Sequence, residues 1–274
     1  MICTATDTPN ARAEALTGRN YISYSALSAY QSCPLRYYFR YVLGLPEDTV
    51  SAALVFGGAI HRAVEHHFRE LLAGNSAPDL DSLLAEYNDA WQDTRLDCVS
   101  FNKGDDFNTL GRLADRMLRA FQASDFAKPN GTIIGVEEEF RGEIVPGCPD
   151  LLARVDLVID RGDELAIVDL KTARSRWSHD QADDASEQLL LYSELVKRLA
   201  PEKSVRLEFA VITKTKEPVV DIHSLPVDPH RVERTKRIVE RVWQSIESGT
   251  FYPAPSPMNC PSCPFREPCR SWSG

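Results

Sequence analysis

The sequence has 274 residues, of which 43% are hydrophobic and 26% are charged, and no apolar run of about 18 residues suggests a membrane span. The formal net charge of −9 disfavours an indiscriminate nucleic-acid binder, although a local basic groove stays open. Residues 1–20 lack the pattern of a secretory signal, so we expect a flexible leader and a cytoplasmic protein. In that compartment clustered cysteines bind metal more often than they form disulfides.

The first half of the chain is predicted to be helical. Ser25 can cap a short helix, and Pro34 is well placed to begin a second helix that ends near Leu43. The stretch VFGGAIHRAVEHHFRELLAG carries an apolar stripe with helical spacing. Two further amphipathic helices are expected near residues 81–97 and 107–123.

The pattern changes to strands after KPNG, residues 128–131. TIIGVEEEF, LLARVDLVID and ELAIVDLKT are short and rich in β-branched residues, and turn residues separate them. A helix near 184–199, strands near 205–213 and 218–225, and a helix near 229–248 complete the pattern. The sequence therefore predicts an α/β or α+β core with a helical N-terminal region.

We expect one domain over residues 21–274. Its predicted parts are a helical region, a strand-rich core and a cysteine-rich tail, over residues 21–127, 128–250 and 251–274.

The hairpin VDLVIDRGDELAIVDLK carries the clearest chemical pattern. Glycine at the first position of a two-residue turn, Gly162-Asp163, suits a type II′ hairpin. Counting outward from that turn places Asp156 opposite Asp169, on one face of the sheet. Leu165 is out of phase with the apolar positions across the hairpin, so a slipped register stays open.

Two carboxylates opposite each other in a sheet repel, and one tends to stay protonated unless a divalent cation compensates both. Oxygen ligands of this kind suit Mg²⁺ or Mn²⁺. Lys171 shares the face of Asp169 and could orient or deprotonate water, or stabilise a pentavalent phosphate. These are parts of a metal-dependent phosphodiester hydrolase. The alternative is a hairpin with polar residues on its solvent face.

Two groups of basic residues could form a local groove. Lys171, Arg174 and Arg176 belong to DLKTARSRW. The second group is interpreted as a solvated helix face, and its members are Arg231, Arg234, Lys236, Arg237 and Arg241.

Asp156, a gap of twelve residues, and then Asp169-Leu170-Lys171 resemble the core of the PD-(D/E)xK nuclease superfamily, and most of all its RecB-like branch. GGAIHRAVEH resembles the branch's helix with a histidine ligand, which maps to His61. QLLLY resembles its Gln-x-x-x-Tyr motif, and SYSALSAYQSCPLRYYFRYV resembles its N-terminal segment with one cysteine before proline. The matches span residues 24 to 269.

The resemblance implies a restriction-endonuclease-like fold, with a central mixed sheet flanked by helices. It also implies a metal-dependent DNase, an exonuclease acting on DNA ends or single strands, in repair or recombination or in CRISPR adaptation. The implied catalytic residues are Asp156, Asp169, Lys171, Gln188 and Tyr192. The implied ligands of Mg²⁺ or Mn²⁺ are His61, Asp156, Asp169 and the backbone carbonyl of Leu170. Gln188 and Tyr192, one helical turn apart, could hold a phosphate or Lys171.

In the iron–sulfur members of this branch, one N-terminal cysteine joins three near the C-terminus around a [4Fe–4S] cluster. The equivalent residues here are Cys33, Cys260, Cys263 and Cys269, and the cluster would be a structural clasp. A Cys₄ zinc site is the alternative, although it more often comprises two Cys-x₂-Cys pairs. Cys3, Cys98 and Cys148 lack comparable spacing and are interpreted as a leader residue and two packing residues.

Some roles stay open at this point. Glu65 follows His61 by one helical turn and could point to the same site, whereas His66 and His67 are expected at the surface. Asp150, in PGCPD, competes with Asp156 as the first carboxylate.

No G-x-x-x-x-G-K-[ST] sequence occurs, so unwinding of DNA would need a helicase partner. CRISPR-adaptation proteins are the other partners that the resemblance allows. The alternative function is a non-catalytic DNA-binding or scaffold subunit that keeps the fold and the cluster. Loss of a metal ligand or of the lysine would indicate that alternative, and none is missing here.

Overall fold

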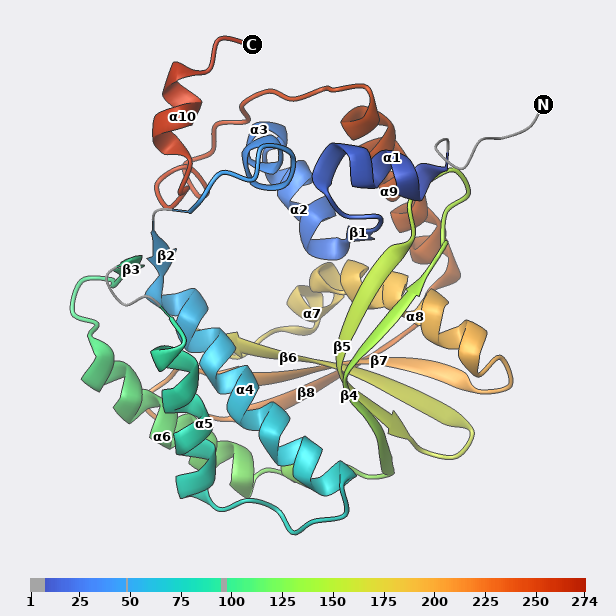
Figure 1. The fold of residues 1–274 in the computed structure, drawn as a ribbon. Helices are drawn as coiled ribbons and strands as arrows, with labels where there is room; N and C mark the ends of the chain where they lie inside the picture. The colour runs from blue at the N-terminus through green and yellow to red at the C-terminus, as the bar shows by residue number, and fades with distance from the viewer. Residues whose placement is uncertain (1–7, 48, 95–97) are drawn as a thin grey trace. The chain divides into compact units, whose positions relative to one another are not determined.

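The computed structural model describes residues 8–47, 49–94 and 98–274, so Cys3 lies outside the described residues (Figure 1). The chain divides into two compact units that interleave along the sequence. Unit 1 comprises Met1–Asp48, Glu139–Ala153 and Asp228–Gly274, and unit 2 comprises Thr49–Glu138 and Arg154–Val227. No described helix is both long and apolar enough to cross a membrane.

A mixed β-sheet lies mostly in unit 2. Its strands are β4 (Thr132–Gly142), β5 (Leu151–Asp160), β6 (Glu164–Ala173), β7 (Ser204–Thr213) and β8 (Val220–Pro226). β6 pairs with β5 in antiparallel and with β7 in parallel orientation, β7 and β8 are antiparallel, and β4 pairs with β5. β6 and β7 are buried along most of their length, which explains why their sequences are nearly continuous apolar runs.

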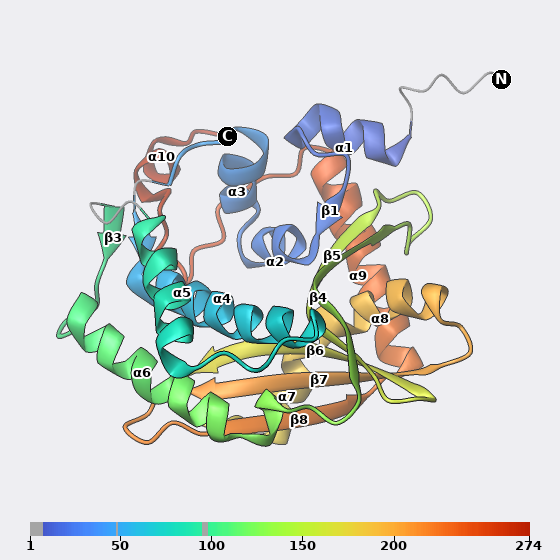
Figure 2. The same ribbon diagram turned by 60° about the horizontal axis from the view of Figure 1, so that its bottom comes forward.

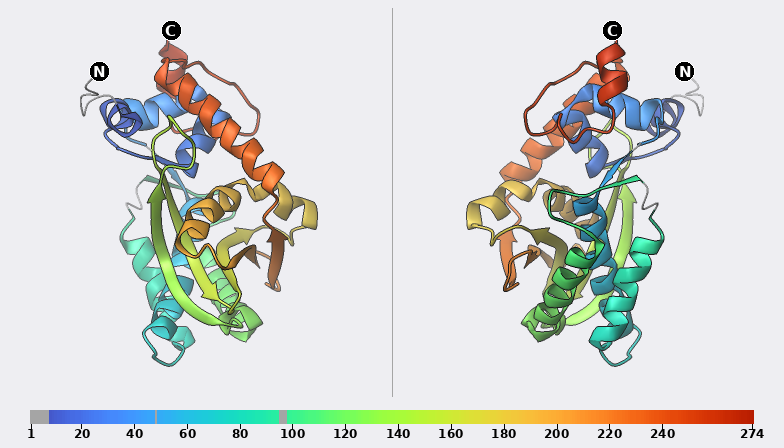
Figure 3. Two further views of the ribbon diagram at one scale, coloured as in Figure 1. Left: turned by 90° about the vertical axis from the view of Figure 1, so that its right-hand side faces the viewer. Right: turned by 90° about the vertical axis from the view of Figure 1, so that its left-hand side faces the viewer.

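Helices cover both faces of the unit 2 sheet. α4 (Ala52–Leu72), α5 (Leu80–Gln92) and α6 (Phe107–Ala123) lie over one face (Figure 2). Their apolar stripes share a core with strand residues such as Leu157, Val168 and Ile212. α7 (His179–Ala185) and α8 (Glu187–Leu199) contact the sheet and lie on the other side (Figure 3). The predicted mixed α/β fold, with a central mixed sheet flanked by helices, is confirmed.

Unit 1 contains the described N-terminal helices and the C-terminal segment. Its elements are α1 (Pro9–Thr17), β1 (Ile22–Ser23), α2 (Tyr24–Ser32), α3 (Pro34–Tyr37), the π-helix η1 (Tyr38–Val42), α9 (Pro229–Glu247) and α10 (Arg266–Ser271). β1 pairs with the first residues of β5. Two short elements of unit 2 also pair, β2 (Val50–Ser51) with β3 (Val99–Ser100), and a 3₁₀ turn, η3, follows α6 (Asp125–Ala127).

The helix near residues 107–123 was predicted with its observed bounds, whereas other boundaries differ. Ser23, not Ser25, caps α2, because the Ser23 hydroxyl accepts a hydrogen bond from the Ala26 amide. The helix expected over 184–199 is two helices, because the short α7 has its own capping box and ends at Ala185, and Ser186 separates it from α8.

The described part of the expected flexible leader contains helix α1. Thr8 caps the helix, Pro9 occupies its first turn, and Gly18 ends it in the left-handed conformation, with φ of 69°. The composition suggested disorder because capping and terminating residues are also common in loops.

His67, expected at the surface, is buried, and its Nε2 lies 2.9 Å from the carbonyl oxygen of Ala127. Two aromatic side chains, Phe68 and Phe121, make edge contacts with its ring. The polar ring is therefore a core residue whose hydrogen bond makes its burial tolerable.

Candidate active site

The β5–β6 hairpin has the register that counting from the turn predicted. The paired residues run from Leu157↔Val168 to Asp160↔Leu165, and the Arg161 amide donates to the Glu164 carbonyl at 2.9 Å. Gly162 has φ of 90°, a conformation that favours glycine. Continuing the register by one residue places Asp156 opposite Asp169. The out-of-phase Leu165 does not shift the pairing, because both faces of this sheet are covered.

Asp156 and Asp169 are held by different partners. Asp156 Oδ2 accepts a hydrogen bond of 2.7 Å from the Leu170 amide, and Lys171 Nζ lies 2.6 Å from Asp169 Oδ2. Burial raises the pKa of Asp156 to about 8, with the negative charge of Asp169 adding to the effect. Burial also raises the pKa of Asp169, while Lys171 opposes that rise. Two poorly solvated carboxylates on one hairpin form a place where a cation would be stabilised.

His61 reaches this hairpin from α4. Its Nδ1 lies 3.7 Å from Asp156 Oδ2. The pKa of His61 is lowered to about 4, mainly by shielding from solvent and then by the positive charge of Lys171, while a hydrogen bond with the Leu170 backbone opposes the change. The imidazole is therefore neutral at pH 7, which is the form that ligates metals.

The position of α4 depends on a glycine one turn before His61. A Cβ atom added at Gly57 would lie 3.4 Å from Thr172 Oγ1 on β6. The helix and the strand therefore approach so closely that hardly more than a methyl group would fit. Gly58 has open space around the same position, so only the first glycine of the GG pair sets this approach.

Gln188 and Tyr192 lie on α8 in unit 2. Gln188 Nε2 donates a hydrogen bond of 3.1 Å to Tyr192 Oη. Tyr192 is buried, and burial raises its pKa to about 12, with the charges of Asp169 and Asp156 contributing. The two members of the predicted Gln-x-x-x-Tyr motif therefore contact each other, and the charges of both carboxylates reach Tyr192.

Glu137, on β4, is a neighbour that the sequence analysis missed. It lines a small cavity together with His61, Glu65 and Asp156. Its φ of 53° is the only positive value of a non-glycine residue in the described chain. Burial raises the pKa of its carboxyl group, the charge of Glu65 adds to the rise, and the charge of Arg154 opposes it. Sequence analysis identified only a strand over TIIGVEEEF, and nothing in that local pattern indicates the left-handed backbone at Glu137.

Asp150, the competing first carboxylate, belongs to unit 1. Its Oδ2 accepts hydrogen bonds from Asn10 at 3.0 Å and from Arg141 at 3.1 Å, and its own amide donates to Asn10 at 2.8 Å. These contacts give Asp150 a structural explanation that needs no metal.

Within the described residues, no group of three or more His, Cys, Asp or Glu side chains is arranged to hold a metal ion as it stands. The expected ligands of the hairpin therefore do not form a finished metal centre: His61 approaches Asp156, while Asp169 pairs with Lys171. The donors themselves fit, because an imidazole, carboxylates and a backbone carbonyl are ligands that Mg²⁺ or Mn²⁺ accepts.

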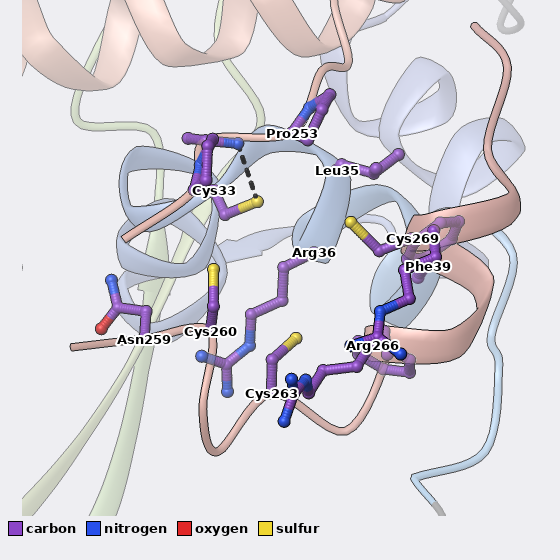
Figure 4. Close-up of a pocket in the computed structure, with 14 residues that line it drawn as sticks. Cys33, Leu35, Arg36, Phe39, Pro253, Asn259, Cys260, Cys263, Arg266 and Cys269 are labelled. Carbon is purple, nitrogen blue, oxygen red and sulfur yellow. Dashed lines mark hydrogen bonds between the residues drawn. The ribbon is translucent and has the colours of Figure 1, made fainter. Parts of the chain in front are cut away.

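The four expected cluster cysteines line one cavity of about 220 Å³ in unit 1. Figure 4 shows the side chains of Cys33, Cys260, Cys263 and Cys269 around it. Three apolar side chains that pack together, Leu35, Phe39 and Phe265, also line the cavity.

The sulfur atoms have few protein partners. The Ala254 amide donates to Cys33 Sγ at 3.5 Å, and the Ser256 amide donates to Cys260 Sγ at 3.2 Å. Burial raises the pKa of Cys269, and the other three thiols add to the rise, which indicates that the four groups are neighbours. A volume of about 220 Å³ is many times the roughly 10–15 Å³ of such space that one water molecule needs, so a polyatomic group fits. The structure itself shows no linkage through iron and sulfide.

The remaining cysteines differ from these four. Cys148 is buried, which fits its expected packing role, whereas Cys98 is partly exposed.

The mixed sheet is flanked by helices and carries two carboxylates and a lysine on one hairpin, with a neutral histidine close to one carboxylate. This arrangement is that of a nuclease-like hydrolase. Residues 21–270 match the PD-(D/E)XK nuclease superfamily, and the chain belongs to that superfamily. Nucleases of this superfamily usually use Mg²⁺ or Mn²⁺.

Several solved structures resemble this chain, and two examples show how distant the likeness is. A crystal structure named "Putative exonuclease", from Eubacterium rectale, is 18% identical, with a TM-score of 0.58, and the match covers 100% of this chain and 94% of that one. At this identity the likeness shows the fold alone. The crystal structure of SSO0001 is 16% identical over 91% of this chain and 96% of that one, with a TM-score of 0.37, and it carries no argument here. Comparison with curated proteins found no match.

Proposed function

We propose that this protein is a metal-dependent DNA exonuclease of the RecB-like branch, which hydrolyses phosphodiester bonds at DNA ends or in single strands. The observation that carries the proposal is the hairpin register, which sets Asp156 opposite Asp169 and leaves Lys171 beside them. His61, 3.7 Å from Asp156, supplies the nitrogen donor. Membership of the PD-(D/E)XK nuclease superfamily supports the class of reaction.

Each residue has a stated task in this proposal. His61, Asp156, Asp169 and the Leu170 carbonyl would hold Mg²⁺ or Mn²⁺, which, when bound, lowers the pKa of water and offsets negative charge on the phosphate. Lys171, held by Asp169, would orient the water whose oxygen attacks phosphorus or would stabilise the pentavalent phosphate. The P–O bond to the leaving nucleotide then breaks, and its oxygen takes up a proton. Gln188 and Tyr192 would hold a phosphate or Lys171.

The carboxylate assignment favours Asp156 over Asp150. Asp150 already has Asn10 and Arg141 as partners, whereas Asp156 is adjacent to His61 and to the Leu170 backbone.

We further propose that Cys33, Cys260, Cys263 and Cys269 ligate a [4Fe–4S] cluster. Four thiols around one cavity, an apolar wall and two N–H···S contacts support it. The cluster would join the α2–α3 junction to the C-terminal segment and act as a structural clasp. A Cys₄ zinc site is the alternative, and metal and sulfide analysis of the purified protein distinguishes the two.

The test of the enzymatic proposal is cleavage of end-labelled single- and double-stranded DNA in Mn²⁺, Mg²⁺ or EDTA. We expect stepwise shortening from an end in either metal and none in EDTA. Binding without cleavage in every buffer would support the non-catalytic DNA-binding or scaffold subunit instead. Association with a helicase or with CRISPR-adaptation proteins, and a cytoplasmic location, belong to the same proposal and follow from the resemblance.

A further inference from the structure

Lys214, directly after β7, is a partly buried cation without a carboxylate partner among the described residues. Its ammonium nitrogen lies 5.3 Å from the centre of the Phe56 ring on α4. Its backbone amide donates a 2.6 Å hydrogen bond to the Ala173 carbonyl, so the end of β6 fixes its position. Burial lowers its pKa, and the second cause, Arg174, is another positive charge.

The register of the sheet places Lys214 beside the candidate active site. β6 and β7 are parallel and in register up to Ala173↔Thr213, so Lys214 lies one residue beyond the paired end that carries Lys171. Ile212 faces α4–α6, and alternation gives Lys214 the same face. Phe56, beneath the ammonium group, precedes His61 on α4 by little more than one turn.

A partly buried ammonium group without an acid partner is unfavourable, and a ring face offsets only part of the cost. The other basic residues of this region are engaged differently: Lys171 pairs with Asp169, and Arg176 pairs with Asp221. Arg174 is exposed next to Lys214. In a protein with net charge −9, two adjacent cations beside a phosphodiester-cleaving site form a place for an external anion.

We propose that Lys214, assisted by Arg174, forms a phosphate subsite that binds the nucleic-acid backbone next to the phosphate being cleaved. This inference rests on the proposed nuclease function, because it assigns the subsite a nucleic-acid strand as its ligand. Lys214 anchors the strand through charge and hydrogen bonds, and Phe56 holds the ammonium group in place from below. The subsite contributes to binding of the strand, whereas Lys171 and the carboxylates act on the reacting phosphate.

The test is Lys214→Met, which keeps an unbranched apolar stem on Phe56 and removes the charge. The measurements are affinity for a short labelled single-stranded DNA in EDTA over a series of salt concentrations, and KM and kcat in Mn²⁺. We expect affinity to fall by about three- to tenfold, the slope of log K against log salt to fall by about one, and kcat to stay within about twofold. Lys214→Arg should restore the slope. Lys216→Met, at an exposed lysine two residues away, is the matched control and should match the parent.

The outcomes are distinguishable. If the parent protein neither binds nor cleaves DNA or RNA, the proposed function fails and the subsite fails with it. If the parent cleaves DNA while Lys214→Met has the parent's salt slope and KM, the subsite is overturned and the nuclease proposal stands. If Lys214→Met does not fold, Arg174→Gln decides the question, because that side chain is exposed: a reduced slope supports the subsite and an unchanged slope overturns it.

Discussion

The carboxylate hairpin of unit 2 and the four-cysteine cavity of unit 1 are built in different ways. In the hairpin, strand register and protein partners already fix the reactive groups: Asp156 has the Leu170 amide, and Asp169 has Lys171. In the cavity, Cys33 and the three cysteines of residues 260–269 come from distant segments, and two weak N–H···S contacts are the hydrogen bonds found at their sulfur atoms.

This difference indicates that the fold alone positions the side chains of the hairpin, whereas nothing in the described chain joins the four thiols directly. Apolar packing on both faces stabilises the sheet, so we expect the sheet to retain its structure when one hairpin carboxylate is replaced. The cavity lacks direct bonds among its thiols, so a group bound by all four would hold distant segments together. We therefore expect substitutions at the hairpin to remove activity with little effect on folding, and substitutions at the cavity to do the reverse.

The largest effect is expected from Asp156→Ala or Asp169→Ala. Either change should reduce DNA cleavage by about a thousandfold or more, because the metal supplies both the activated water and charge compensation. Circular dichroism and the visible spectrum should match those of the parent, and DNA binding should persist. Lys171→Ala should also lose activity while keeping the metal.

Asp150→Ala is the control for this prediction and should cleave DNA. An inactive Asp150→Ala variant beside a normal Asp156→Ala variant would reverse the assignment of the first carboxylate.

Substitutions at the cavity should affect folding more than activity, which is the opposite of the effect expected at the hairpin. The purified parent is expected to be brown, with broad absorbance near ~400 nm from a [4Fe–4S] cluster. Cys33→Ala and Cys260→Ala should lose iron and thermal stability to similar extents, despite their separation in sequence. Cys98→Ala, at a cysteine outside the cavity, should keep the parent's iron content. Zinc without iron or sulfide in anaerobically purified protein would contradict the cluster, and full iron content in Cys33→Ala would place the fourth ligand elsewhere.

The sequence predicted the hairpin because a two-residue turn fixes where counting begins, although Leu165 left a slipped register open. It predicted the mixed α/β fold and the long α6 because their hydrophobic periodicity is strong. The same local patterns could not show that Glu137 has a left-handed backbone or that His67 is buried against Phe121.

Tertiary contacts decide these features. The position of Lys214 could not be predicted from the sequence either, because only the pairing of β6 with β7 and the packing of α4 place it over Phe56. The functional surroundings of a site were therefore less predictable than its central motif.

A smaller effect is expected from Gly57→Val, which tests whether helix packing positions His61. The added side chain would press against Thr172 and displace α4 from β6. We expect affinity for Mn²⁺, measured by calorimetry, to fall by about tenfold, as it does when groups that orient metal ligands are changed. Gly58→Val is the matched control, because nothing lies within 4 Å of that position. Equal affinities in the two variants would show that the approach at Gly57 does not position the histidine.

The smallest expected effect is on the pH dependence of stability. It measures how much the burial of the ionised Asp156 carboxylate destabilises the folded protein. The pKa of this carboxyl group is raised from 3.8 to about 8, first by burial and then by Asp169. Between pH 4 and 8 the folded protein therefore keeps a proton that the unfolded chain releases, so stability falls as pH rises through this window. In EDTA, Asp156→Asn should lose less thermal stability than the parent from pH 5 to pH 8.

Asp160 supplies a control, because its pKa shift has the opposite sign to that of Asp156. A hydrogen bond with Lys203 lowers the pKa of Asp160, so its stabilisation is present above the ordinary carboxyl pKa and is lost only at lower pH. Asp160→Asn should therefore lower the melting temperature by a similar amount at pH 5 and at pH 8, without changing the slope between them. Mn²⁺ should raise the melting temperature of the parent most at pH 8, because a cation compensates the ionised carboxylate there. Parallel melting curves for the parent and Asp156→Asn across this range would mean that Asp156 is ionised without cost, and that the hairpin needs no cation to hold its two acids together.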